Sequence, residues 1–445
     1  MPIYRTFVSG QCGMGFYEAI MLIKYETTPN EAGYMDTARQ NGNKPDILSS
    51  SVFREVQKDL ERLLLGNGFN TVMFHPHALN ALADRIMEQM QKSYPDMQIP
   101  PKSCWRALEG QNVDRFGVLA SAQGFATETD FFRSASDLAI LCALADIRLP
   151  ADWTFLDPMS GARLEGVSAK SVATAVMFGS GVFSSDPSAP MRADAYALSR
   201  VTADEVSAGF QFENGQGANA ANALARQFRR LGELIAIRTD LFEDSDGIRP
   251  GNIANKLRSE LVSPNIDAGV LLDAVFDGLT AIWDGGAVEK DRILGDVWAS
   301  SLENTNEGAD LWSFHLPAGA VCLNLIEPFG WTGFGMISLD VLPAPSDTGH
   351  AALFKESGLL SRTEGADPTL AACELRAATM AASKLVASSV RQKLEVGSDT
   401  LPMACLIEAG TQPMCRKLRL EKPQLWSDLD KMMDPRGVHW LPFGA

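Results

Sequence analysis

The sequence has few basic residues, few histidines and no closely paired cysteines. Its 445 residues contain 39 Lys and Arg against 55 Asp and Glu, which gives a formal net charge of −16. This charge repels phosphate backbones and anionic membrane surfaces, and no Lys/Arg-rich run offsets it. We therefore expect neither nucleic acid nor a membrane as a partner.

Long apolar runs and secretion signals are also missing. No stretch approaches the length needed to cross a bilayer, and the start, MPIYRTFVSGQCGMGF, lacks the pattern of a signal peptide. The seven cysteines form no CxxC pair, which is typical of reduced core thiols rather than of a disulfide frame or zinc site. These features predict a cytoplasmic protein.

Several catalytic signatures are absent as well. Neither a GxSxG elbow nor a GxxxxGK[ST] loop occurs, so serine-hydrolase and P-loop mechanisms have no support. The doublet His75-Pro76-His77 has no acidic partner at ligand spacing and predicts a loop-to-helix junction rather than a metal site. We expect no metal and no cofactor.

What is present is a globular composition with helical periodicity. Hydrophobic residues make up 46% of the chain and charged residues 21%. Amphipathic spacing and capping signals predict helices over residues 49–66, 77–94, 128–147, 165–179, 217–237, 266–283 and 367–396. Strand signals are limited to residues 71–74 and 335–342. The prediction is a mostly α fold, a single compact multi-helix domain with few short strands, with loop-rich segments before residue 46 and after Lys422.

Glu374 is the most informative carboxylate. In the helix ADPTLAACELRAATMAASKLV, its face carries Ala377, Ala378, Ala381 and Leu385, a stripe of small residues typical of close packing. A carboxylate on such a face needs a partner, and Arg376 lies about 200° around the helix. Glu374 is therefore either a buried residue held by an arginine from another helix or a site carboxylate.

Three further stretches combine charged residues with turns or aromatic rings. FSSDPSAPMRADAY places Asp186 in a turn and Arg192 after it, where they either fix the turn or face a ligand. CWRALEG offers Trp105 and Arg106 either as a core edge or as a grip for a small anion. FHLPAGAVCLNLIEPF begins near a histidine and ends near a glutamate, so its polar residues either cap a core helix or flank a former site.

These stretches, taken in order, resemble the uracil-catabolism family of fungi, plants and bacteria. The motifs are YPDMQIPPKSCWRALEG, GSGVFSSDPSAPMRAD, IRPGNI, LLDAVFDGLTAIW, LGDVW, FHLPAGAVCLNLIEPF, CELRAAT and IEAGTQP. The resemblance covers residues 94–422, which predicts a divergent N-terminal helical region over 1–93 and a C-terminal tail over 423–445. More distantly, LPAPSDTGHAALFKESGLL and CELRAAT resemble a queuosine-salvage family that cleaves an N-glycosidic bond.

The resemblance implies hydrolysis of an N-glycoside in pyrimidine degradation, acting on a ribosylated urea or a nucleoside-like compound. Such a reaction needs a carboxylate to stabilise an oxocarbenium-like transition state. Glu374 and Asp347 are the catalytic candidates that the resemblance gives. The candidates for substrate binding are His315, Arg376, Asp186, Arg192, Trp105, Arg106 and Glu327.

The chain also departs from the family pattern. After the histidine, the family has a Lys and a Ser-Gln-Trp patch, whereas this chain has Leu316, Ala318, Gly319 and Ala320. Where the family has Pro-Glu-Tyr-Arg, this chain has PAPSDTGH, which leaves Asp347 as the nearest carboxylate. Two hypotheses stay open: an N-glycosidase-like hydrolase, or a non-catalytic relative that binds a nucleoside-like ligand or a protein partner. The oligomeric state is unknown.

Overall fold

Helices form most of the chain in the computed structural model, which describes residues 46–150, 152–212, 217–299, 311–363, 367–434, 437, 438 and 440. Each predicted helix is present, with ends within a few residues of the prediction. These helices are α4 (Ser50–Leu65), α5 (Leu79–Ser93), α8 (Glu128–Leu144), α9 (Gly166–Gly179), α12 (Ala218–Ile237), α15 (Ala268–Leu279) and α18 (Pro368–Leu394). The mostly α prediction is confirmed.

Further helices lie between these or follow them. They are α6 (Trp105–Leu108), α7 (Arg115–Gln123), α10 (Ala195–Leu198), α11 (Ala203–Gly209), α13 (Thr239–Phe242), α14 (Asn252–Glu260), α16 (Leu316–Trp331), α17 (Thr348–Glu356), α19 (Met403–Leu406), α20 (Gln412–Glu421) and α21 (Pro423–Met433). The prediction of a loop-rich segment after Lys422 was wrong, because α21 starts there. Its proline occupies the first turn, where no backbone donor is needed, and Trp426, Leu429 and Met433 form its buried face.

The strands in the described residues form two-stranded ribbons rather than a large sheet. The antiparallel pairs are β1 (Val72–Phe74) with β12 (Leu360–Arg362), β2 (Phe155–Leu156) with β3 (Arg163–Leu164), β4 (Glu243–Asp244) with β5 (Gly247–Ile248), β7 (Val288–Glu289) with β8 (Arg292–Ile293), and β9 (Val297–Ala299) with β10 (Leu311–Ser313). The parallel pair is β6 (Asn265–Asp267) with β11 (Gly335–Ile337). The predicted strand at 71–74 corresponds to β1, whereas β11 covers only the first three residues of the predicted strand at 335–342, and Leu339–Val341 form a 3-10 helix.

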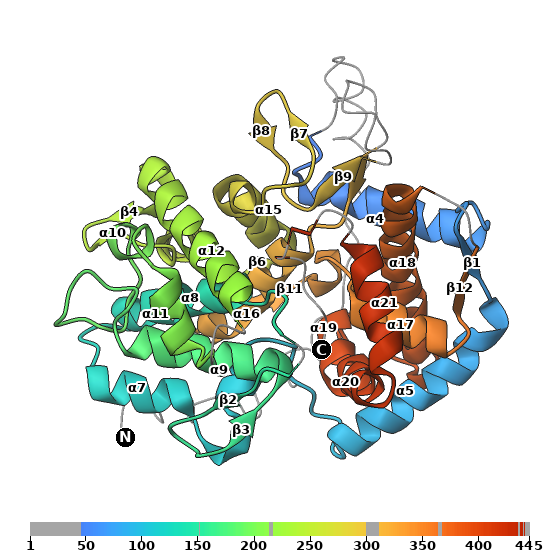
Figure 1. The fold of residues 1–445 in the computed structure, drawn as a ribbon, viewed down its shortest axis with the longest axis horizontal. Helices are drawn as coiled ribbons and strands as arrows, with labels where there is room; N and C mark the ends of the chain where they lie inside the picture. Colours follow the sequence, from blue (N-terminus) through green and yellow to red (C-terminus); the bar gives the residue numbers. More distant parts are fainter. Residues whose placement is uncertain are drawn as a thin grey trace.

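Figure 1 shows the helices in two groups that lie side by side. One group contains α7 to α12, with α15 and α16 on its inner side. The other contains α17 to α21 together with α4 and α5, although these two helices are far away in the sequence. Both α4 and α5 pack against α18, so the N-terminal described helices belong to the core of the second group.

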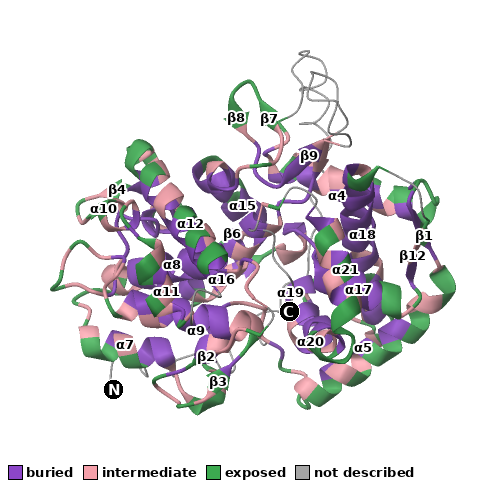
Figure 2. Cartoon of the chain, viewed as in Figure 1, coloured by how far each residue is buried: buried purple, intermediate pink, exposed green. Residues whose placement is uncertain are grey.

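Each group is built around a buried helix, as Figure 2 shows by colour. In the first group, every residue from Phe132 to Leu144 of α8 is buried, and α16 packs along it. In the second, every residue from Ala371 to Ser383 of α18 is buried. The small side chains of α18 allow α4 to approach closely, which explains the alanine-rich stripe.

Buried ion pairs fix several loops of the first group. Arg115 and Asp157 meet at 2.7 Å, and Arg249 meets Asp137 at 2.6 Å, with all four side chains buried. Asp137 also accepts hydrogen bonds from the backbone of Ala193 and Gly251. Such pairs hold loops in place because removal of one partner leaves a buried charge uncompensated.

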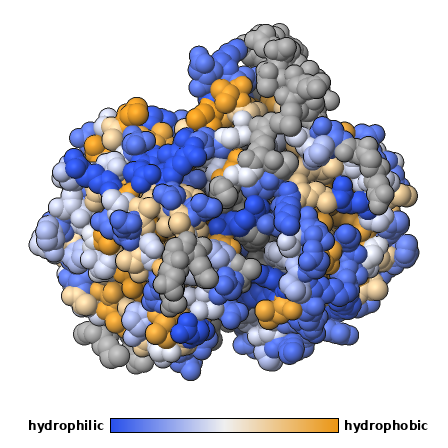
Figure 3. All heavy atoms as spheres, viewed as in Figure 1, coloured by the Kyte–Doolittle hydropathy of each residue, from blue (hydrophilic) through white to orange (hydrophobic). Residues whose placement is uncertain are grey.

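The surface is polar and the described cysteines are buried, as expected from the composition. The face in Figure 3 is mostly hydrophilic, with apolar side chains in separate patches. The six cysteines within the described ranges are buried, as predicted for core residues, whereas Cys12 lies outside those ranges. Among the described helices, none is long and apolar enough to cross a bilayer.

Candidate functional site

A small cavity between the two helix groups is lined by several charged residues, two of which are predicted site residues. It has a volume of about 10 Å³, enough for roughly one water molecule. We call it the interior cavity. Its lining residues are Arg148, Leu316, Ser346, Asp347, Thr348, Arg376, Asp430, Met433 and Asp434.

Asp347 lies in this cavity at the N-terminus of α17. Its carboxylate caps the helix by accepting from the backbone N–H of His350 at 3.0 Å, and it also contacts Nδ1 of the same imidazole at 2.8 Å. Burial opposes the ionisation of this carboxyl, but attraction and hydrogen bonds from His350 outweigh it and hold the pKa of Asp347 below its ordinary value. Asp347 is therefore a buried, ionised carboxylate.

The other nitrogen of His350 reaches a hydroxyl. Its Nε2 lies 2.9 Å from Oγ1 of Thr411, which belongs to the single π-helical turn Ile407–Thr411. The order carboxylate, imidazole, hydroxyl is that of a hydrolase triad. Thr411 is only 2% exposed and does not line the interior cavity. We therefore assign this chain of contacts to fixing the orientation of Asp347.

The pKa of a second carboxyl in the cavity shifts in the opposite direction. Burial raises the pKa of Asp430 above its ordinary value, although Arg148 and a hydrogen bond from Thr348 act against the rise. Arg148 donates to Asp430 at 2.8 Å and pairs with Asp434 at 3.2 Å. The cavity thus contains one carboxyl held ionised and one that retains its proton more readily.

Arg376 reaches the cavity from α18, but its guanidinium is already paired with Asp296. Its two terminal nitrogens contact the two oxygens of Asp296 at 2.6 and 2.8 Å, and its guanidinium lies 4.1 Å from the centre of the Phe314 ring. Burial opposes ionisation of Asp296, yet Arg376 and further donors keep the pKa of Asp296 below its ordinary value. Arg376 therefore forms part of the wall rather than a free cation.

The two stretches that the resemblance predicts to depart from the family pattern lie in direct contact. Gly319 of α16 packs on the proline-rich segment before α17, and a Cβ at this position would come within 2.8 Å of Cδ of Pro343. The oxygen of Pro345 in turn accepts from Ser383 on α18. Leu316, another replaced position, lines the cavity. Gly319 of α16 and the segment around Pro343 thus fit each other closely.

Glu374 does not line the interior cavity. Its carboxylate accepts four hydrogen bonds, from the backbone N–H and side chain of Asn70 at 3.0 Å and from those of Thr71 at 2.6 Å. These residues lie directly before β1. The partners of Glu374 are therefore neutral donors, not the arginine that one of the two sequence interpretations required. Its catalytic role stays a prediction.

His315 lies in the apolar core next to the cavity. Its ring packs between Phe53 and Phe276, with ring centroids 5.0 and 4.4 Å away. Burial lowers the pKa of His315 to about 4, although Asp296 and a hydrogen bond with the backbone of Ile47 oppose the change. Its backbone has a φ of 51°, in the left-handed region, directly before α16. His315 is therefore a neutral core residue in this structure.

Trp105, Arg106 and Glu327 come together at another place. Trp105 donates to the backbone oxygen of Asn324 at 2.8 Å, Arg106 pairs with Glu327, and Ser103 donates to Glu327 at 2.6 Å. Burial raises the pKa of Glu327 to about 7, against the effect of Arg106. These contacts attach residues 103–106 to α16, and none of the three residues lines the interior cavity.

Asp186 and Arg192 lie in a loop of the first group. Asp186 accepts from the backbone and hydroxyl of Ser188, which lowers the pKa of this exposed carboxyl. Arg192 donates to the backbone oxygen of Asp246 at 2.8 Å. The structure thus brings only Asp347 and Arg376, of the predicted residues, into the interior cavity; the binding roles of the others stay predictions.

Sequence reasoning missed four charged groups of this region: Arg148, Asp296, His350 and Asp430. A signal existed for two of them. His350 follows Asp347 by three residues, the spacing of a capped helix start. Asp430 lies in α21 next to a buried apolar stripe, and Asp434 follows at the C-terminal end of this helix. Arg148 and Asp296 have no local sequence signal, because only tertiary packing brings them to this region.

Comparison with known proteins places this chain in a family. The family model described as "Protein of unknown function (DUF1688)" matches residues 46–424, which is most of the chain and includes α4 and α5. The chain therefore belongs to this family.

Two relatives agree with the resemblance found in the sequence motifs. The chain is 26% identical over 286 residues to "Uracil catabolism protein 4" of Lachancea kluyveri, covering 60% of this chain and 64% of that protein. It is 23% identical over 354 residues to "Protein urg3" of Schizosaccharomyces pombe, covering 76% of this chain and 84% of that protein. The matched part of the chain spans less than two thirds of the first relative. The similarity to the uracil-catabolism family is confirmed, and the distant similarity to a queuosine-salvage N-glycosidase stays a prediction.

The contacts of Glu374 predict a structural cost for its neutral isostere. In Glu374→Gln, the amide nitrogen cannot accept, so at least one backbone donor of Asn70 or Thr71 loses its partner. We expect a loss of about 1–3 kcal/mol in the free energy of unfolding, measured by urea titration. Glu421→Gln, at an exposed position on α20, is the control and should change stability by less than about 0.5 kcal/mol. A Glu374→Gln protein as stable as the control would contradict this assignment.

The lowered pKa of His315 predicts a specific dependence of stability on pH. Between pH 6.5 and about 4, the unfolded chain binds a proton that the folded chain does not, so stability falls as the pH is lowered through this window. The contribution is about 3 kcal/mol. His315→Asn, which tolerates the left-handed backbone, should show a shallower slope than the parent in urea titrations at pH 4.5 and 7. Equal slopes would show that His315 is not buried as a neutral ring.

Proposed function

We propose that this chain is a hydrolase of uracil degradation that cleaves the N-glycosidic bond of a ribosylated urea or nucleoside-like compound in the interior cavity. The observation that carries the proposal is the pair of cavity carboxyls with opposite pKa shifts, Asp347 lowered and Asp430 raised. Environments that separate two carboxyls in this way are typical of sites where one is an anion and the other an acid. Family membership and the names of the two relatives support the pathway.

The charge of the cavity suits this reaction. Three aspartates line it against two arginines, and one arginine, Arg376, is compensated by Asp296. An excess of negative charge stabilises a sugar ring that becomes positive as its bond to nitrogen breaks. The same excess disfavours a phosphate group at this position. The reaction that we propose therefore takes place at the ribosyl carbon.

Each carboxyl has a defined role in this proposal. Asp347 faces the developing oxocarbenium ion and stabilises it electrostatically. Asp430 gives its proton to the leaving nitrogen while the carbon–nitrogen bond breaks. A water molecule then adds its oxygen to the ribosyl carbon and returns a proton to Asp430, which restores the starting state. Because the cavity holds roughly one water, α21 must shift away from α17 to admit the sugar.

The second candidate is a relative without catalytic activity that binds a nucleoside-like ligand or a protein partner. The observation in its favour is the close fit of Gly319 against Pro343, at a position where the resemblance leads us to expect polar residues. If this fit is permanent, α21 stays in its present position and the cavity remains too small for a sugar. The two candidates differ in whether any ribosylated compound is hydrolysed.

The proposal predicts that Asp347→Asn removes activity without unfolding the chain. Purified protein is incubated with ribosylurea, its phosphate and common nucleosides, and released urea, base and sugar are followed. The variant should lose on the order of 10²-fold or more in turnover, because the charge disappears from the transition state. Its melting temperature should stay within a few degrees, since Asn also caps helices.

Asp367→Asn is the matched control for this test. Asp367 caps α18 by accepting from the backbone of Thr369 and Leu370, and it does not line the cavity. The control should keep full turnover. Hydrolysis that survives in Asp347→Asn would overturn the role of Asp347, and a parent chain that hydrolyses none of these compounds would favour the non-catalytic candidate.

A further inference from the structure

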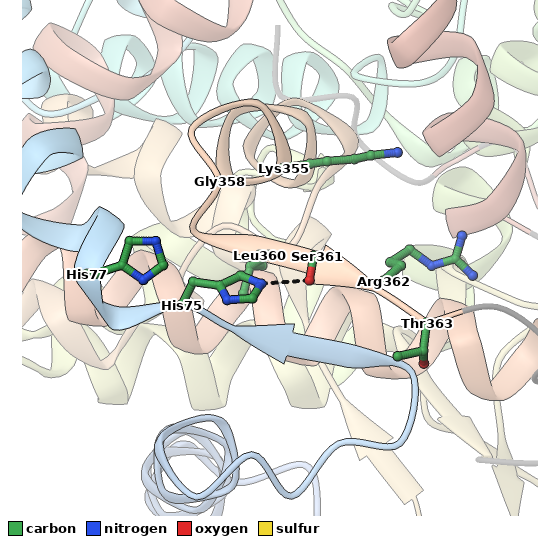
Figure 4. A pocket seen from close by; sticks show the side chains of 8 residues that line it. All are labelled: His75, His77, Lys355, Gly358, Leu360, Ser361, Arg362 and Thr363. Atoms are coloured by element: carbon green, nitrogen blue, oxygen red, sulfur yellow. Dashed lines mark hydrogen bonds between the residues drawn. The ribbon is translucent and has the colours of Figure 1, made fainter.

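A second cavity lies on the surface of the second group and is separate from the interior cavity. Its volume is about 630 Å³, within the range of small-molecule sites. Figure 4 shows its eight lining residues. They are His75, His77, Lys355, Gly358, Leu360, Ser361, Arg362 and Thr363. We call it the ribbon cavity, because the β1–β12 ribbon and the residues beside it form most of its wall.

The chemistry of this wall is unusual for so acidic a chain. Four of the eight residues are basic and two carry hydroxyls, while no lining residue is acidic. In a chain with a net charge of −16, this local reversal of sign attracts small anions. Leu360 is the single aliphatic lining side chain, so the wall does not suit an apolar ligand or an amphipathic helix.

The cations of the ribbon cavity are available to a ligand. Within the described residues, neither Lys355 nor Arg362 forms an ion pair; the adjacent Glu356 instead pairs with Lys422 at 2.6 Å. Nε of Arg362 is buried without a hydrogen-bond partner in the same part of the chain. In Figure 4 the side chains of Lys355 and Arg362 extend in the same direction. A phosphate oxygen would supply the acceptor that Arg362 lacks.

Contacts throughout the ribbon hold this wall in place. Nε2 of His75 lies 2.7 Å from the hydroxyl of Ser361, and the backbone of His75 donates to Leu359. At the other end, Thr363 donates through its backbone to Thr71 and through its hydroxyl to Asn70. Asn70 and Thr71 are the residues that Glu374 binds.

The turn between α17 and β12 completes the wall. Gly358 makes this turn with a φ of 72°, a conformation that residues with side chains rarely adopt. The turn places Lys355, in the last turn of α17, beside the start of β12. The cavity is thus preorganised rather than formed by chance between loose side chains.

We propose that the ribbon cavity binds the phosphate group of a phosphorylated small molecule. Lys355 and Arg362 supply the charge, and the hydroxyl of Ser361 with the imidazoles of His75 and His77 supplies further hydrogen bonds. A metal is disfavoured because no group of three metal-ligating side chains exists in the described residues. The site is separate from the proposed reaction, since Asp347 and Lys355 lie at opposite ends of α17, about 12 Å apart along its axis.

The test is calorimetric titration of the full chain at low ionic strength with inorganic phosphate and with pyrophosphate. Succinate is the comparator, because it carries two negative charges without a phosphate group. We expect saturable binding of pyrophosphate that weakens as salt is added. Lys355→Gln and Arg362→Gln should each weaken it at least about 10-fold. Lys355→Gln changes an exposed side chain, so the test remains informative even if Arg362→Gln does not fold.

Lys417→Gln is the matched control, because it removes the same charge from an exposed position on α20. It should bind pyrophosphate as the parent does. The proposal is overturned if neither phosphate compound binds saturably, if the control loses as much affinity as Lys355→Gln, or if succinate binds as tightly as pyrophosphate. These outcomes do not depend on whether the chain hydrolyses any ribosylated compound.

Discussion

The buried pair between Arg376 and Asp296 connects the two helix groups, and the geometry of the interior cavity depends on it. Asp296 accepts from Arg376 of α18, from the indole of Trp298 and from the backbone of Leu316 at the start of α16. One carboxylate thus fixes α16, β9 and α18 relative to each other. Loss of either partner would leave a buried charge unpaired, at a cost of about 3–5 kcal/mol.

This connection explains how a scaffold can remain intact while its site changes. With α16 held at Leu316, the small residue Gly319 allows the segment around Pro343 to pack on the helix, and Asp347 then begins α17 beside the cavity. A side chain in place of Gly319 would push this segment away. The segment around Pro343 therefore requires a glycine at position 319 in order to pack on α16.

The helices were predictable from the sequence because their signals are local, whereas the site was predictable only in part. Apolar periodicity and caps locate α4, α8 and α18, and the helix face of Glu374 correctly indicated a buried carboxylate. The partners of Glu374 lie more than 300 residues away in the sequence, so no local pattern indicates them. Arg148 and Asp296 are likewise brought to this region only by packing, whereas α21 carries local signals, a proline in its first turn and a short buried apolar stripe.

The pH dependence of kcat/KM for hydrolysis of a ribosylated substrate tests the acid and anion roles most directly. The proposed reaction requires Asp347 ionised and Asp430 protonated, so its rate should fall below the lowered pKa of Asp347 and above the raised pKa of Asp430. In Asp430→Asn, the residual rate should lose its alkaline limb, because the amide does not titrate. An alkaline limb at the same pH in parent and variant would contradict the assignment of Asp430 as the proton donor.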